Sequence, residues 1–153
     1  VPFQFDATTQ ITYTDTIPAD ITSTISDITD IAQVDTLCLY LDITSALPAT
    51  VGVKLLFLDD EFNLIRESTP FEITSAEVDE LGKVKTPTIQ SKTIQFGNDL
   101  VEDIVNTKNI MFEVRLKGYD NSSKIYIQST DKIDIDLSVF AKAKINLTSG
   151  INN

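Results

Sequence analysis

The sequence predicts an all-β chain that folds as an antiparallel, immunoglobulin-like β-sandwich with one or two short helices. Ile and Thr each occur 19 times among the 153 residues, and β-branched side chains pack well on pleated sheets but lose χ1 freedom in helices. Apolar and polar residues alternate along many short segments, which is the period of a half-buried strand. Polar turns separate these segments. Nine or ten short strands of this kind are typical of two packed sheets.

The first half of the chain has four segments with strand periodicity. They are residues 1–5, 11–17, 37–43 and 51–58. The run Asp59-Asp60-Glu61-Phe62-Asn63 then indicates the polar turn of a hairpin that returns through Leu64 and Ile65.

The second half continues the same pattern in shorter pieces. Its predicted strands lie at residues 71–73, 89–94, 110–116, 125–127 and 133–147. The segment 78–84 indicates a tight connection in which Gly82 takes a positive φ, and residues 120–123 indicate another turn.

The last predicted strand, residues 133–147, is unusually long for one strand. We expect a bend or bulge between Phe140 and Ala143, because Phe140 interrupts the polar face. An open apolar edge invites aggregation, so we also expect this strand to be central in its sheet or paired along most of its length.

Two segments have helical spacing. Asn98 is a candidate N-cap for residues 99–105, where the apolar side chains form one stripe and the acidic ones favour the first turn. In residues 18–34, Ile21 and Ile25 fit a helix, but the high Thr and Asp content argues against a long regular one. We expect a short helix or a covered loop there.

Several classes of chemistry are excluded by side chains that the sequence lacks. There is no His, which is the side chain best suited to proton transfer near neutral pH and the commonest ligand of zinc and copper. Cys38 is the single cysteine, so an intrachain disulfide, a multi-thiolate metal site and a Cys–His pair are impossible. Its apolar neighbours favour a small buried hydrophobe over a reactive thiol. We therefore expect no catalytic residues and no enzyme.

The formal charge of −11 argues against two kinds of partner. An acidic surface repels phosphate backbones and anionic lipid headgroups, so we expect no nucleic-acid partner and no direct insertion of this domain into a membrane. The acidity is uneven, because residues 108–153 carry 7 basic and 5 acidic side chains.

The chain is expected to form a single β-sandwich domain over residues 1–153. Its length suits one domain, and no Pro-, Gly- or Ser-rich linker divides it. Because it begins at Val1 instead of Met, we expect it to be one part of a longer exported precursor.

The turn at residues 59–63 is the candidate metal site. Asp59, Asp60, Glu61 and Asn63 carry oxygen atoms of the kind that Ca²⁺ prefers. Their spacing matches no complete calcium loop, and acidic hairpin tips also serve solubility. We expect no other cofactor.

The turn formed by Tyr119, Asp120 and Asn121 is the candidate ligand-binding site. Sugar sites usually recruit an aromatic ring, the chain has no Trp, and Tyr119 is the Tyr most plausibly exposed. Packing within a strand is the alternative for Tyr119, and turn chemistry alone accounts for Asp120 and Asn121.

Three stretches together resemble a known group of proteins. They are the hairpin from Val53 to Ile65, the preceding segment from Leu37 to Pro48, and the tail from Lys132 to Ile145. These stretches resemble uncharacterised exported envelope lipoproteins of Gram-negative gut bacteria. The resemblance implies an extracytoplasmic β-sandwich at the cell envelope or outer-membrane surface, where an upstream segment would carry any lipid anchor. It implies no site residues.

These observations lead to two hypotheses about function. The first is a non-catalytic extracytoplasmic β-sandwich module for adhesion, assembly or partner docking, with a protein partner reached through strand edges or loops. The alternative is a glycan-binding module of a surface carbohydrate-uptake system, in which Tyr119 and the acidic turns contact the sugar.

Overall fold

The computed structural model describes residues 3–5, 11–26, 34–116 and 125–143. In chain order its elements are β1 (Phe3–Phe5), β2 (Ile11–Pro18), α1 (Ile21–Ser26), β3 (Val34–Ser45), β4 (Val51–Leu58), β5 (Leu64–Glu67), β6 (Phe71–Ile73), β7 (Glu77–Val78), β8 (Val84–Thr86), β9 (Thr88–Gly97), α2 (Asn98–Ile104), β10 (Asn109–Leu116), β11 (Ile125–Ile127) and β12 (Ile133–Ala143). Among these residues, no helix is long and apolar enough to cross a membrane.

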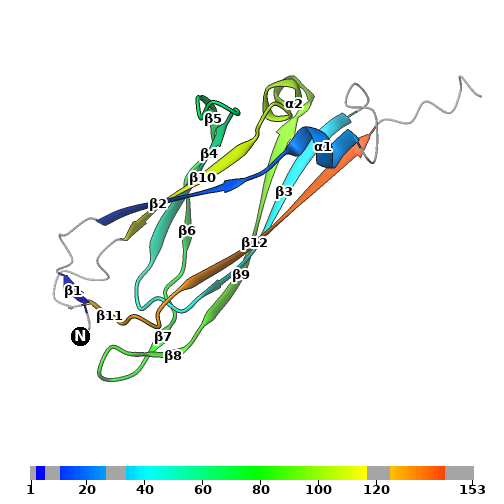
Figure 1. Cartoon of the computed structure of the whole chain (residues 1–153). Helices are drawn as coiled ribbons and strands as arrows, with labels where there is room; N and C mark the ends of the chain where they lie inside the picture. The colour runs from blue at the N-terminus through cyan, green and yellow to red at the C-terminus, as the bar shows by residue number, and fades with distance from the viewer. Residues whose placement is uncertain (1–2, 6–10, 27–33, 117–124, 144–153) are drawn as a thin grey trace, which may run out of the picture.

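Two antiparallel sheets face each other and form the sandwich (Figure 1). The larger sheet has the order β2-β10-β4-β5, with β6 also paired to β4, and the smaller sheet has the order β12-β3-β9. Two small ladders, β1 with β11 and β7 with β8, complete the described strands. The all-β sandwich fold and its two short helices confirm the expected fold class. The strands outnumber the nine or ten expected because short pieces such as β7 and β8 flank turns.

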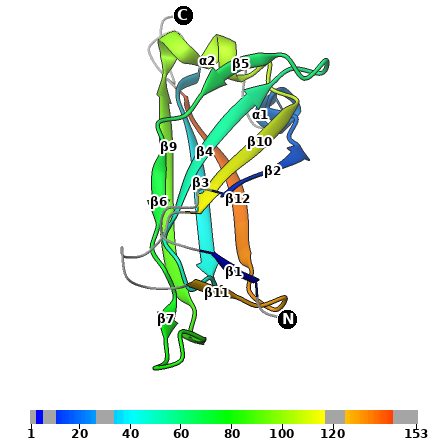
Figure 2. The same ribbon diagram turned by 90° about the vertical axis from the view of Figure 1, so that its left-hand side faces the viewer.

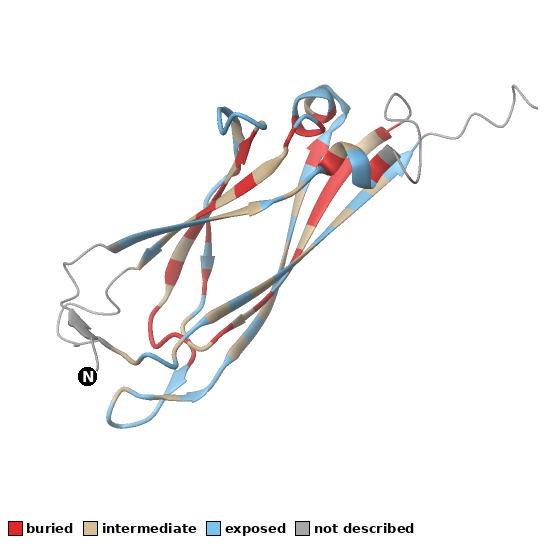
Figure 3. Ribbon diagram, in the orientation of Figure 1, coloured by how far each residue is buried: buried red, intermediate tan, exposed pale blue. Residues whose placement is uncertain are grey.

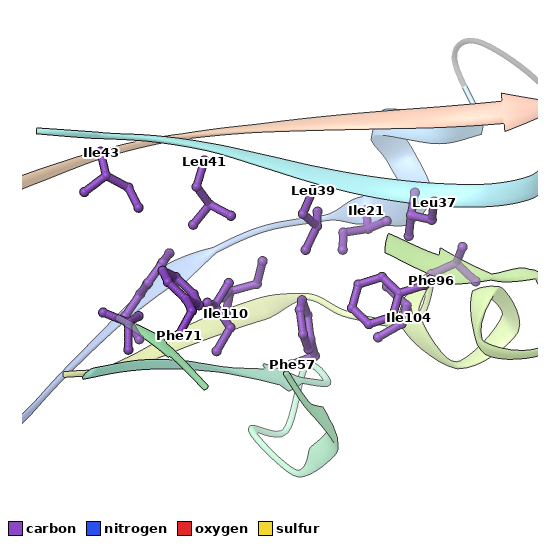
Figure 4. Packing of buried hydrophobic residues seen from close by; sticks show 14 of the residues in the cluster. Ile21, Leu37, Leu39, Leu41, Ile43, Phe57, Phe71, Phe96, Ile104 and Ile110 are labelled. Atoms are coloured by element: carbon purple, nitrogen blue, oxygen red, sulfur yellow. The ribbon is translucent and has the colours of Figure 1, made fainter. Parts of the chain in front are cut away.

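The core lies between the two sheets and is dominated by one face of β3 (Figure 4). Leu37, Leu39, Leu41 and Ile43 are all fully buried there, and they face side chains of β4, β6 and β10 such as Phe57. Alternate residues of a strand point to the same face, so a run of alternating apolar residues makes a continuous apolar row. The predicted periodicity of residues 37–43 is therefore confirmed.

The two helices close one end of the sandwich. Ile21 and Ile25 of α1 and Ile104 of α2 are almost fully buried, and the ring of Phe57 meets that of Phe96 edge-to-face at 5.4 Å. Each helix is short, so its stability depends on burying these apolar side chains. The expectation of a short helix within residues 18–34 is confirmed for α1, and residues 27–33 lie outside the described part.

Asn98 is not the N-cap of its helix, contrary to expectation. Gly97 occupies the N-cap position with φ −68° and ψ 171°, and no side chain caps the helix. The reason is that β9 runs up to Gly97, so the chain is already helical at Asn98. In α1, by contrast, the Asp20 carboxylate accepts a hydrogen bond from the Ser23 N–H at 3.0 Å and another from Lys108 Nζ at 2.8 Å.

β12 is the described part of the strand predicted at residues 133–147, and residues 144–147 lie outside the described residues. This edge strand meets the second alternative of the expectation, which was a strand either central in its sheet or paired along most of its length. It pairs with β3 over its whole length, which confirms extensive pairing, but no described strand pairs with its other edge. The register shifts between Lys142 and Ala143, where two residues of β3 oppose one of β12. The irregularity therefore lies where it was expected, with the extra residue, Asp35, on β3.

We predict that Leu39→Ala lowers the free energy of unfolding by about 3 kcal/mol, because it leaves a cavity under the centre of β3. Leu81→Ala is the matched control, since Leu81 is 71% exposed, and it should change stability by less than about 0.5 kcal/mol. Urea unfolding followed by circular dichroism measures both. Equal losses in the two variants would contradict the position of the core.

Candidate functional site

The acidic turn between β4 and β5 is built around one carboxylate. Asp59 Oδ1 accepts hydrogen bonds from the N–H groups of Glu61 at 2.9 Å and Asn63 at 2.8 Å. Asp59 Oδ2 accepts a third from Asn63 Nδ2 at 3.1 Å. The Asp59 N–H donates to the Asn63 carbonyl at 3.0 Å and thereby closes the loop. The hydrogen bonds of the Asp59 carboxylate therefore stabilise its own hairpin.

The hairpin between β7 and β8 repeats this arrangement with a different sequence. Asp79 Oδ1 accepts hydrogen bonds from the N–H groups of Leu81 at 2.8 Å and Lys83 at 3.0 Å, and the Asp79 N–H donates to the Lys83 carbonyl at 2.8 Å. Turn geometry alone therefore explains an aspartate at the first position of either loop.

The structure brings the four candidate calcium ligands into one loop, with Asp60, Glu61 and Asn63 exposed. Among the described residues, no cluster of three or more acidic, His or Cys side chains is arranged to hold a metal ion. The two backbone N–H groups at Asp59 Oδ1 compete with any cation for the same oxygen. Calcium binding at this loop stays a prediction, to be tested by titration.

The candidate glycan-binding residues Tyr119, Asp120 and Asn121 lie outside the described residues. Cys38 is free and buried, as expected for a small hydrophobe.

The two long sides of the sandwich differ (Figure 2). On one side, β9 closes against β6 through Gln90, whose Oε1 accepts from the Thr74 N–H at 3.0 Å and whose Nε2 donates to the Glu72 carbonyl at 3.0 Å. One side chain thus bonds the backbone of the opposite sheet, as a neighbouring strand would. Thr88 adds a hydrogen bond from its hydroxyl to the Ser75 carbonyl at 2.8 Å.

The other side, between β2 and β12, has no such closure by hydrogen bonds among the described residues, although α1 contacts β12 at one end of it. No hydrogen bond joins the described parts of these two strands, and both are edges of their sheets. Tyr13 of β2 is 62% exposed and Phe140 of β12 is 57% exposed, and Figure 3 shows both strands in tan and pale blue, without the buried residues that mark β3. The inward residues of β12 are only half buried. This side is the candidate functional surface, and we call it the open side.

Sequence reasoning missed this surface. The alternation of residues 133–143 predicts a strand with one apolar face, but it is the same for an edge strand and a central strand. The sequence of β9 does contain an indication of an edge. Gln90 and Lys92 are polar, although they lie on the same inward face of β9 as Ile94, which packs against the core. Such a polar group on an inward face indicates a strand at the rim of its sheet.

No family model matches the sequence, and no curated protein matches it. Two solved structures of viral proteins overlap with it, one of infectious bursal disease virus strain Gx and one of the VP2 subviral particle of that virus. Both are 9% identical and cover 91% of this chain, with TM-scores of 0.45 and 0.38. This chain spans 28% and 29% of those viral chains.

The two matched hairpins generate a prediction about backbone strain. Phe62 has φ 64° where the other loop has Gly82 with φ 77°, and this region disfavours residues that carry a Cβ. We predict that Phe62→Gly raises the free energy of unfolding by about 1 kcal/mol. Gly82→Ala is the matched reverse variant and should lower it by about the same amount. Destabilisation by Phe62→Gly would show that the Phe62 ring stabilises the fold more than its backbone strains it.

The Asp59 carboxyl should titrate below its ordinary pKa of 3.8. The hydrogen bonds from Asn63, first from its N–H and then from its side chain, favour the ionised form and lower the pKa. The stabilisation is present above the unfolded-state pKa and is lost as the pH falls through the lower folded-state pKa. Carboxyl NMR measures this directly, and Asp59→Asn should flatten the loss of stability below about pH 4. A carboxyl that titrates above 3.8 would contradict these hydrogen bonds.

Proposed function

We propose that this chain is a non-catalytic β-sandwich module that docks onto a protein partner through the open edge of β12. The observation that carries the proposal is the position of β12 at the end of the order β12-β3-β9. Adhesion or assembly at the cell envelope is the setting that the sequence resemblance implies.

An edge strand can bind a strand of a partner protein. It presents backbone N–H and C=O groups that an incoming strand pairs with, while pockets for alternate side chains supply specificity. β12 offers Ile133–Ala143 for this purpose. Its inward side chains, Ile135, Leu137 and Val139, are half buried, so an added strand would also cover apolar surface.

The non-catalytic part of the proposal rests on the residue types. Without His, general acid–base chemistry would fall to carboxylates. The carboxylates with a lowered pKa among the described residues are Asp20 and Asp59, and both are engaged by hydrogen bonds that form a helix cap or a turn. The glycan-binding alternative depends on Tyr119, which lies outside the described residues, and on the acidic turns.

The test uses a pair of proline variants of the edge strand. Consecutive residues of an antiparallel strand direct their N–H groups to opposite edges. Proline has no N–H, so one of the variants Ser138→Pro and Val139→Pro removes a hydrogen bond to β3. The other variant removes an N–H group from the open edge. The variant that keeps the wild-type melting temperature identifies the open-edge residue.

The binding experiment applies the labelled wild-type chain and this variant to intact bacterial cells, to envelope proteins and to a glycan array. We predict protein-dependent binding by the wild type and its loss in the open-edge variant. Equal binding by both proteins would contradict docking through β12. Binding to a glycan that survives the proline would instead support the alternative function.

A further inference from the structure

We infer that the occupant of the β12 edge is β12 of a second copy of this chain, paired antiparallel about a two-fold axis that passes midway between the two Val139 residues. This inference rests on the proposed function, because it names the partner of the same edge. It joins the two smaller sheets into one continuous sheet with the order β9-β3-β12-β12-β3-β9. Such an interface is isologous, so every contact occurs twice.

The charges on β12 favour this register. With Val139 opposite its own copy, Asp136 lies opposite Lys142, and the same pair forms again across the axis. Directly opposed charges of opposite sign stabilise antiparallel strands. Neither residue forms an ion pair with another described residue. Within one copy, Asp136 lies opposite Asp42 of β3, which is a like charge, and Lys142 lies opposite Thr36.

The sizes of the inward side chains also match in this register. Leu137 lies opposite Ala141, and Ile135 lies opposite Ala143, which is exposed at the end of the strand, so each of these two large side chains meets a small one. Alternating large and small residues interdigitate well at a junction. On the outward face, Ser138 lies opposite the 57% exposed ring of Phe140. No charged side chain of Ile135–Ala143 is placed opposite an apolar one.

The register displaced by two residues toward the N-terminus of β12 fits less well. Moving the axis to Ser138 places Asp136 opposite Phe140 and Asp134 opposite Lys142. Asp134 already pairs with Lys132 within one copy, at 2.9 Å between Nζ and Oδ2. In the displaced register, Lys142 therefore meets Asp134, which already has Lys132 as its partner. Asp136 then lies opposite the ring of Phe140 and has no partner of opposite charge.

The other edge of the open side lacks this self-complementarity. β2, Ile11–Pro18, carries Asp15 and no basic residue, so two copies paired through β2 would bring only acidic charge together. β12 belongs to the one third of the chain in which basic residues exceed acidic ones. β12 itself carries Asp134, Asp136 and Lys142, so of these two edges it is the one that offers a basic side chain to an acidic one of its copy.

Charge reversal tests the inference. Asp136→Lys and Lys142→Asp each place two like-charged pairs in the interface, so each variant should dimerise at least about tenfold more weakly than the wild type. Asp136→Lys also replaces a like-charge pair with Asp42 by an attraction, so its monomer should stay folded. A mixture of the two variants restores both pairs and should form a heterodimer. Glu80→Lys at the exposed β7–β8 turn carries the same change in charge as Asp136→Lys and is its matched control.

Sedimentation velocity at near-physiological ionic strength, from micromolar to millimolar protein, measures these associations. A wild type that dimerises, two single variants that do not, and a mixture that does would support the inference. A wild type that stays monomeric up to millimolar concentration would overturn it. If that monomer still binds an envelope protein through β12, the proposed function stands while the self-pairing fails.

Cysteine cross-linking tests the register. Val139→Cys places two thiols directly opposite each other across the axis, within reach of a disulfide. Ser138→Cys is the matched control, because in this register each Ser138 lies opposite Phe140 of the other copy and not opposite the second Ser138. Preferential oxidation of the Val139→Cys dimer supports the assignment. Preferential oxidation of Ser138→Cys would overturn it in favour of the displaced register.

Discussion

The burial of one face of β3 is the constraint on which the rest of this structure depends. Its row of leucines and Ile43 is fully buried, and the same strand carries β12 on one edge and β9 on the other over nearly its whole length. Burial of each large aliphatic side chain contributes roughly 1.5–3 kcal/mol, before the cost of ordering the chain. Because residues one position apart point to opposite faces, this row fixes the register of the whole smaller sheet.

The two sides of the sandwich show how the remaining edges are managed. Gln90 closes the side next to β6 by bonding its backbone in both directions. The side between β2 and β12 is capped at one end by α1, where Ile21 and Ile25 enter the core. Along β12 itself the outward side chains include Asp134, Asp136 and Lys142, and charged side chains discourage indiscriminate pairing of an edge. An edge protected in this way is selective, since it accepts only a strand whose charges complement its own.

Local features of the fold could be predicted from the sequence, while the order of the strands could not. The alternation at residues 37–43 and 133–143, the hairpin after Leu58, the positive φ of Gly82 and the helical stripe before Asn106 all follow from neighbouring residues, and the structure confirms them. The edge position of β12 depends on which distant strand pairs with each side, and the sequence pattern of β12 is the same in either case.

For the candidate site, the acidic loop was found from its composition, but composition does not reveal that Asp59 is engaged by its own backbone. The repeat of that geometry at Asp79, where the loop sequence differs, separates turn chemistry from ligand chemistry.

Native-state hydrogen exchange of the β12 amides tests the central claim, which is that one edge of this strand is open in a single copy. In dilute protein we predict alternation along Ile133–Ala143: amides that donate to β3 exchange slowly, and their neighbours exchange fast. Slow exchange at every position of β12 in dilute, monomeric protein would contradict the account, because it would show that this edge is covered within one copy of the chain.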